Sequence, residues 1–228
     1  LGLHHACQRA HQELGISAQL ILCFLRHLSE EDALATLEAA LPWREHFIGV
    51  GLDSSERGHP PEKFARVFAK AAELGLHRVA HAGEEGPPAY VTGALDVLKV
   101  ERIDHGVRCT EDPALVGRLV REQVPLTVCP LSNVKLCVFP DLARHNLGQL
   151  FAAGLKVTIN SDDPPMFNTN LTNEYLQIAE TFGFGVEVIE RLVLNGVTAS
   201  LLPAERKAQL ADEFRAELAR LRAEFLSS

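Results

Sequence analysis

Six short apolar runs alternate with segments of helical period, and this alternation constrains the fold more than any other feature of the sequence. The runs are continuously apolar rather than alternating in polarity, which is typical of parallel strands that helices cover. Short connections between strand and helix predict right-handed βαβ units and an α/β fold, either a doubly wound sheet or a barrel. The predicted strands are 18–26, 47–53, 77–83, 102–106, 126–130 and 156–162.

Helices are predicted between these strands, and several carry signals at their first residues. Ser29 with Asp32 is a capping pair, and the Pro60-Pro61 and Pro87-Pro88 pairs suit the first turn of a helix. The predicted helices are 29–41, 60–74, 87–98, 112–122 and 140–153.

The pattern changes after Asp163, where only helices are predicted. They cover about 171–182, 185–196 and a long amphipathic stretch from 203. One stripe of the last helix is expected to pack against the body of the domain rather than to bind a partner helix. That stripe consists of Leu210, Phe214, Leu218, Leu221 and Phe225. The 228 residues therefore suit one domain, with βα units over 1–170 and C-terminal helices over 171–228.

Composition excludes several classes of partner. The net charge is −8 and the basic residues are dispersed, which argues against nucleic-acid binding. The longest apolar run is far shorter than the roughly 20 residues that span a bilayer, so no membrane partner is expected. Five cysteines without a C-x-x-C pair suit a reducing compartment, and a cytoplasmic location is predicted. The oligomeric state is left open.

Ionisable residues gather where four of the predicted strands end. Each has an ordinary explanation alone: a histidine at a strand end is commonly a hydrogen-bonded polar residue, and "SDDP" suits a helix cap. Together they resemble the active-site end of a parallel barrel, where the loops after the strands carry the chemistry. These residues are Asp53-Ser54-Ser55-Glu56, His81 with Glu84, Asp104-His105 and Asp162-Asp163. Six other histidines are expected to be solvated: His4, His5, His11, His46, His59 and His145.

The same residues suit a catalytic zinc. Zinc takes imidazole nitrogen and carboxylate oxygen and keeps one position open for water, and His81 and Asp162 have the right donor atoms. Adjacent side chains on a strand point to opposite sides, so Asp162 and Asp163 are expected to have different tasks. The prediction is one zinc ion per complete active site.

Four motifs carry a resemblance to a known family. "HAGE" at 81–84, "RIDHG" at 102–106, "CPLSN" at 129–133 and "NSDDP" at 160–164 occur in the order seen in the adenosine/adenine deaminase family. That family belongs to the zinc-dependent amidohydrolases, and the resemblance implies a (β/α)8 TIM-type barrel. It runs through essentially the whole chain, which would correspond to strands 3–8 plus the C-terminal helices.

The resemblance also implies roles for single residues. His81 and Asp162 would be zinc ligands, and His105 would hold and help to deprotonate the water that attacks. Glu84 would bring a proton to N1 of a purine, and Asp163 would bond N7. Ser55 and Gly83 would lie against the substrate. The implied reaction is hydrolytic deamination in purine salvage.

Two stretches favour adenine over adenosine as the substrate. The adenosine-using branch has glycine where this chain has Glu56, and that carboxylate could accept the N9–H that only free adenine has. A nucleoside would leave it unpaired at a cost of about 1–3 kcal/mol. The stretch "VKLCVF" at 134–139 also resembles the adenine-using branch. The alternative is that these two stretches differ from the adenosine-using branch by chance, with no effect on substrate choice.

The chain departs from the family in one respect. The family's first strand carries a His-x-His pair that supplies two zinc ligands, and no His-x-His occurs here. With two protein ligands instead of four, zinc would be held weakly. We therefore expect these residues to be an incomplete barrel that is catalytically poor or dead by itself.

Three alternatives to adenine deamination remain open at this point. They are deamination of adenosine to inosine, a non-catalytic barrel remnant that serves as a binding or oligomerising module, and another amidohydrolase reaction. The last is disfavoured by Glu84 and the Asp162-Asp163 pair, because such enzymes typically bridge two metals with a modified lysine.

Overall fold

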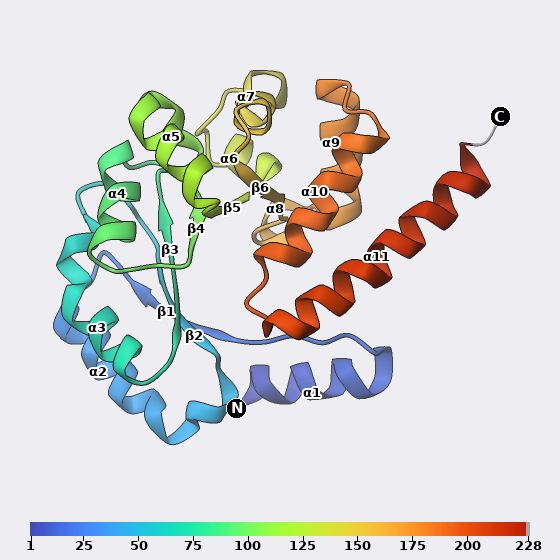
Figure 1. Ribbon diagram of the computed structural model, residues 1–228. Coiled ribbons are helices and arrows are strands. Elements are labelled where there is room, and N and C mark those ends of the chain that lie inside the picture. Colours follow the sequence, from blue (N-terminus) through green and yellow to red (C-terminus); the bar gives the residue numbers. More distant parts are fainter. Residues whose placement is uncertain (227–228) are drawn as a thin grey trace. The chain divides into compact units, whose positions relative to one another are not determined.

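The structure, a computed structural model, describes residues 1–226 and consists of two compact units (Figure 1). The N-terminal unit is Leu1–Asp104 and the C-terminal unit is His105–Ser228. All six predicted strands are present, and each lies within or close to its predicted range. That the two units form a single domain stays a prediction from the sequence.

The N-terminal unit contains parallel strands in the order β1-β2-β3-β4. Strand β1 pairs with β2 from Ile21 with Gly49 to Leu25 with Asp53, and β2 pairs with β3 from Gly49 with His77. Helices α2, α3 and α4 contact these strands (Figure 1). The elements are α1 Gly2–Leu14, β1 Ile21–Leu25, α2 Glu30–Ala40, η1 Leu41–His46, β2 Gly49–Asp53, η2 Pro61–Phe64, α3 Ala65–Glu73, β3 His77–Ala82, α4 Pro88–Asp96 and β4 Arg102–His105.

The predicted helix starts in this unit are confirmed. Ser29 caps α2 in a capping box, in which its hydroxyl oxygen accepts from the Asp32 backbone N–H and the Asp32 carboxylate accepts from the Ser29 N–H. Pro61 and Pro88 occupy the first positions of η2 and α4. The hydrophobic core of this unit includes Phe24 and Phe68. Both residues are buried, and their rings pack edge to face.

The C-terminal unit pairs β5 with β6 in parallel, from Pro125 with Lys156 to Val128 with Ile159. Helix α10 packs on β6 and on α11. Two short helices, α6 after β5 and α8 in the loop after β6, begin at prolines and are absent from the predicted helix ranges. The elements are η3 Val107–Glu111, α5 Pro113–Glu122, β5 Pro125–Val128, α6 Pro130–Lys135, η4 Leu142–Arg144, α7 Leu147–Ala152, β6 Lys156–Ile159, α8 Pro164–Phe167, α9 Leu171–Phe182, α10 Val186–Ala199 and α11 Ala204–Phe225.

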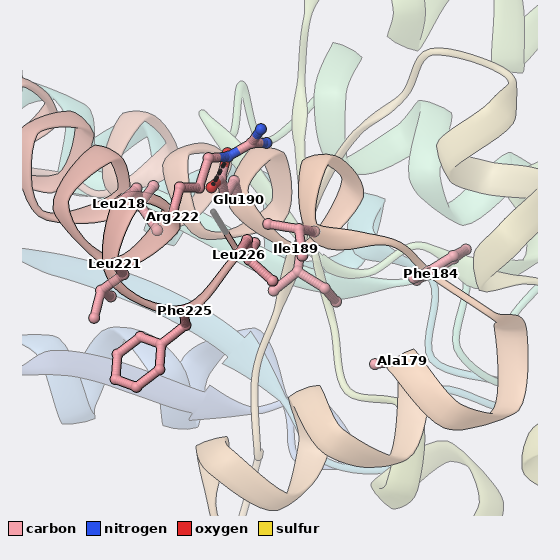
Figure 2. A pocket seen from close by; sticks show the side chains of 10 residues that line it. Ala179, Phe184, Ile189, Glu190, Leu218, Leu221, Arg222, Phe225 and Leu226 are labelled. Atoms are coloured by element: carbon pink, nitrogen blue, oxygen red, sulfur yellow. Dashed lines mark hydrogen bonds and ion pairs between the residues drawn. The ribbon is translucent and has the colours of Figure 1, made fainter. Parts of the chain in front are cut away.

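The stripe of α11 is only partly buried, contrary to expectation. Phe214 and Phe225 are exposed, and Ala211 is the buried residue of this helix. A bidentate ion pair, Arg222 to Glu190 at 2.6 and 2.8 Å, fixes α11 against α10. Beside it lies an apolar cavity of about 430 Å³, to which Leu218, Leu221 and Phe225 contribute (Figure 2). None of the candidate site residues lines this cavity.

No helix among residues 1–226 is both long enough and apolar enough to cross a membrane.

Candidate functional site

The candidate residues of the N-terminal unit lie at the carboxyl ends of its strands. Continuing the register of β2 and β3 places Asp53 level with His81. The His81 side chain is 29% exposed, and its Nδ1 lies 3.9 Å from Oδ2 of Asp104. Arg102 Nε donates to the other oxygen of Asp104 at 3.0 Å. A carboxylate beside one imidazole nitrogen is the arrangement that orients histidine ligands in metal sites.

Asp53 is a second carboxyl group next to His81. Burial raises its pKa above the usual range, and the nearby His81 opposes that shift. Its Oδ1 is buried without a hydrogen-bond partner among the described residues. Ser54 and Ser55 follow in the exposed turn, where the Ser54 hydroxyl lies 2.8 Å from Nδ1 of His27.

The loop that carries Glu84 is held by Glu56, whose residue is only 3% exposed. One carboxylate oxygen of Glu56 accepts the Gly83 N–H at 2.6 Å. The other accepts the N–H groups of Glu84, Glu85 and Gly86 at 3.0, 2.8 and 2.8 Å. Hydrogen bonds to a carboxylate are among the stronger ones in proteins. Glu56 therefore organises the "HAGE" loop; its contact with a substrate stays a prediction.

A buried arginine holds the other side of the same loop. Arg26 is fully buried and donates to the His81 carbonyl oxygen at 2.6 Å and to the His59 carbonyl oxygen at 2.7 and 3.0 Å. Burial lowers the pKa of Arg26, and Glu56 opposes that shift. Gly86 leaves room for this arrangement, because a Cβ there would lie 2.6 Å from a Glu56 oxygen.

In the C-terminal unit the strand β6 ends at Ile159, three residues before Asp162. The expectation that strand pleating separates Asp162 from Asp163 is therefore wrong. Asp162 lies in a turn with a φ of 57°, and Asp163 follows as the exposed residue that precedes α8. The two side chains still have different surroundings, but the turn is the cause.

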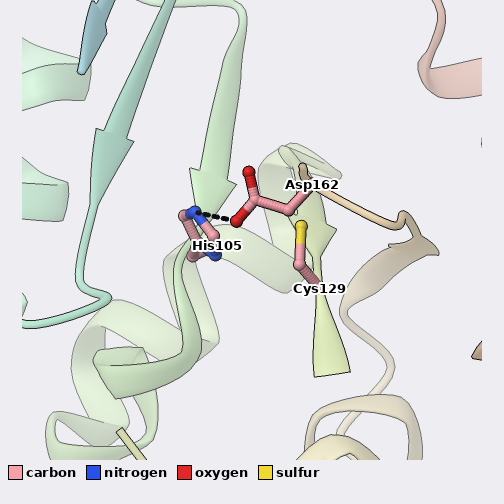
Figure 3. A group of neighbouring side chains, drawn as sticks. All are labelled: His105, Cys129 and Asp162. Carbon is pink, nitrogen blue, oxygen red and sulfur yellow. Dashed lines mark ion pairs between the residues drawn. The ribbon is translucent and has the colours of Figure 1, made fainter. Parts of the chain in front are cut away.

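Asp162 lies beside His105. Its Oδ2 accepts the Ser132 hydroxyl at 2.7 Å and lies 4.0 Å from Nε2 of His105 (Figure 3). The potential ligand atoms of His105, Cys129 and Asp162 all lie within 4.8 Å of one another. Cys129 Sγ also lies 3.6 Å from the Thr127 carbonyl oxygen, which suits a thiol that donates.

Three buried polar residues around this pair were missed by the sequence reasoning. Ser132 and Asn133 lie in the "CPLSN" motif, which the sequence singled out without a role for either. His145 was expected to be solvated, and this is wrong: it is 4% exposed and its Nε2 lies 3.1 Å from Asn133 Oδ1. Its neighbours in sequence, "ARHN", gave no sign of burial.

Glu174 of α9 is fully buried near Asp162. It accepts the Leu131 backbone N–H and the Thr169 hydroxyl, both at 3.2 Å. Burial raises the pKa of Glu174, and the negative charge of Asp162 adds to the effect. This residue ties α9 to the start of α6, the segment that also supplies Ser132.

The burial of His145 predicts a pH-dependent stability. Burial lowers the pKa of His145 to about 4, below the ordinary value of 6.5. The unfolded chain therefore binds more protons between these two values, and stability falls as the pH drops from about 6.5 towards 4. The free energy of unfolding, measured with urea at pH 7 and at pH 5, should decrease less for His145→Gln than for the unmodified chain. Between pH 7 and pH 5 the difference is about 2 kcal/mol, and an equal loss in both proteins would contradict the prediction.

Within each unit, some of the predicted residues lie next to one another, whereas Ser55 and Asp163 are exposed. Glu56 contacts the backbone of Gly83 and Glu84, and His105 lies beside Asp162. The roles assigned to these residues remain proposals.

The chain is similar to proteins of one known family. Residues 2–217 match the adenosine deaminase family. The chain is 61% identical over 202 residues to an adenine deaminase of Geotalea uraniireducens, covering 88% of this chain and 57% of the relative. It is 60% identical over 211 residues to an adenine deaminase of Trichlorobacter lovleyi, covering 91% and 60%. The chain thus spans about 60% of the length of these relatives.

Solved structures are similar as well. The crystal structure of adenine deaminase from Arthrobacter aurescens matches with a TM-score of 0.93 and 47% identity, covering 96% of this chain and 67% of that one. An amidohydrolase from Burkholderia ambifaria with bound zinc matches with a TM-score of 0.91 and 28% identity, covering 97% and 62%. These likenesses confirm the predicted α/β barrel fold class. The chain belongs to the adenosine deaminase family.

Proposed function

We propose that the protein containing this chain deaminates adenine hydrolytically, giving hypoxanthine and ammonia. The observation that carries the proposal is the pairing of the buried His105 imidazole with the Asp162 carboxylate, in a sequence about 60% identical to adenine deaminases. The reaction consumes one water: the C6–O bond forms, the C6–N bond breaks, and the amino group leaves as ammonia.

The residues present fit a zinc ion. Imidazole and carboxylate are common zinc ligands, and Asp104 lies on the Nδ1 side of His81 as an orienting group would. We propose His81 and Asp162 as zinc ligands, in line with the bound zinc of the Burkholderia ambifaria amidohydrolase. When bound, zinc lowers the pKa of water from about 15.7 towards about 7, which permits attack at neutral pH.

The protein groups supply the rest of the chemistry. Glu84 brings a proton to N1 of the purine, which makes C6 more electrophilic. His105 holds the attacking water, and Asp163 bonds N7. Gly83 and Ser55 border the substrate, and Gly83 is buried in the loop that Glu56 holds.

Adenine is preferred over adenosine as the substrate because of two observations. The relatives at about 60% identity are adenine deaminases, and Glu56 stands where the adenosine-using branch has glycine. The Glu56 oxygens already accept four backbone N–H groups, so the relatives give the stronger support. Adenosine deamination is the second candidate, because the family model describes adenosine deaminase.

Zinc removal tests this proposal. A chelator is expected to abolish conversion of adenine to hypoxanthine, and zinc is expected to restore it, because water is a poor nucleophile without the metal. The 228-residue chain is measured by itself and joined to the N-terminal part of the Geotalea uraniireducens relative that precedes the match. The second form is expected to supply the His-x-His strand that the family resemblance implies. Turnover that survives complete zinc removal in either form would contradict the proposal.

A further inference from the structure

A buried chain of hydrogen bonds, referred to below as this line, runs from the Leu147 backbone through His145 and Asn133 to His105. The Leu147 backbone N–H donates to Nδ1 of His145 at 3.0 Å. Nε2 of His145 lies 3.1 Å from Oδ1 of Asn133, and Nδ2 of Asn133 lies 3.2 Å from Nδ1 of His105. His145, Asn133 and His105 are 4%, 0% and 2% exposed, so water does not compete along this line.

The direction of these bonds follows from their first member. A backbone N–H can only donate, so Nδ1 of His145 accepts and carries no hydrogen. Since burial lowers the pKa of His145 to about 4, the ring is neutral near pH 7 and its hydrogen is on Nε2. That nitrogen donates to the Asn133 carbonyl oxygen, which leaves the Asn133 amino group facing His105.

We infer that His145 and Asn133 are positioning residues that keep the hydrogen of His105 on Nε2, the nitrogen that faces Asp162. Nδ1 of His105 must accept from the Asn133 amino group, so a neutral ring carries its hydrogen on Nε2. That N–H lies on the side of Oδ2 of Asp162, at 4.0 Å (Figure 3). His105 then acts on the attacking water as a hydrogen-bond donor and holds it in place, so in this tautomer it does not take the proton of the water as the family resemblance implies.

The surroundings keep this line in one orientation. The ring of Phe139 lies 4.3 Å from the ring of His145, centroid to centroid, and limits its rotation. The Asn133 backbone N–H also bonds the Cys129 carbonyl oxygen at 2.9 Å, within the first turn of α6. If the His145 donor is lost, the Asn133 amide loses the hydrogen bond that sets its orientation in this line.

The tautomer is tested by ¹⁵N NMR of the His105 ring, which distinguishes protonated from unprotonated nitrogens. The unmodified chain is expected to show hydrogen on Nε2. Asn133→Asp presents an acceptor to Nδ1 and is expected to move the hydrogen there or to produce a cationic ring. His145→Gln keeps a donor to Asn133 and is expected to preserve the Nε2–H form, whereas His145→Leu is expected to give a mixture. A ring with hydrogen on Nδ1 in the unmodified chain would overturn the inference, as would an unchanged tautomer in Asn133→Asp.

Asn146→Asp is the matched control. Asn146 is a half-buried amide in the same unit, and it donates to the Val107 carbonyl oxygen and the Thr110 hydroxyl. This variant is expected to lose stability and to retain the His105 tautomer. If it changes the tautomer as Asn133→Asp does, general loosening of the unit is the cause and the inference fails.

The effect of the His105 tautomer on catalysis rests on the proposed function, whereas the tautomer itself does not depend on that function. In the zinc-loaded protein, Asn133→Asp is expected to lower kcat for adenine by about 10²-fold or more, with a smaller change in KM and unchanged zinc content. His145→Gln should retain most of the activity. If the NMR result holds while no form deaminates adenine, the proposed function fails and the positioning role stands. If the tautomer changes without loss of kcat, the positioning role in catalysis fails.

Discussion

Replacing Glu84 with glutamine is expected to lower kcat for adenine by about 10²–10⁴-fold, the range typical for loss of a general acid. The amide cannot give a proton to N1, so C6 stays a poor electrophile. KM should change less than kcat, because glutamine has nearly the same shape and can still donate a hydrogen bond. The measurement is steady-state kinetics with adenine on the zinc-loaded chain joined to the N-terminal part of the relative, with zinc content measured in parallel.

Glu85→Gln is the control for this variant. Glu85 is the next residue of the same loop, and its backbone N–H also bonds Glu56. Its side chain, however, pairs with Arg57 at 3.4 Å. We expect nearly unchanged kinetics. Equal losses in both variants would show that the loop tolerates no change of charge, and the proton-transfer role of Glu84 would be withdrawn.

Glu56→Gln is expected to release the loop that carries Glu84. A carboxylate has two acceptor oxygens, and here one receives one N–H group and the other receives three. Glutamine has one acceptor oxygen and an amino group, so it leaves at least one buried N–H facing a donor. Each unsatisfied group costs about 1–3 kcal/mol. Faster hydrogen exchange at Gly83 to Gly86 should accompany a lower free energy of unfolding.

Glu30→Gln is the control that distinguishes release of the "HAGE" loop from a general loss of stability. Glu30 is also a buried carboxylate that accepts backbone N–H groups, those of Arg66 and Val67 at 2.5 and 3.2 Å. It joins α2 to α3 and has no bond to the "HAGE" loop. This variant should be destabilised while exchange at Gly83 to Gly86 stays slow. Similar exchange in both variants would contradict the assigned role of Glu56.

The strands and most helices were predictable because their signals are local. Continuous apolar runs mark covered parallel strands, and the capping box at Ser29 and the prolines at 61 and 88 mark helix starts. The exposure of apolar residues on α11 was not predictable, because periodicity identifies an apolar stripe but does not show which residues cover it. Phe214 and Phe225 are exposed members of that stripe.

The candidate residues were predictable where a strand end and a motif coincide, as at His81 and His105. Their supporting residues were not. Glu56 binds a loop 27 to 30 residues further along the chain, and His145 is linked to His105 through Asn133. Such roles depend on which backbone groups lack partners after folding, and no local pattern shows that. The separation of Asp162 from Asp163 was predicted for the wrong reason, because a turn with positive φ replaces the expected strand.

The most direct test of the central claim compares kcat/KM for adenine and adenosine on zinc-loaded protein, joined to the N-terminal part of the relative as described above. We expect release of ammonia and hypoxanthine from adenine, with kcat/KM well above that for adenosine. Faster turnover of adenosine would contradict the assigned substrate. Absence of turnover of both purines, in protein that is folded and holds zinc, would contradict the assigned reaction.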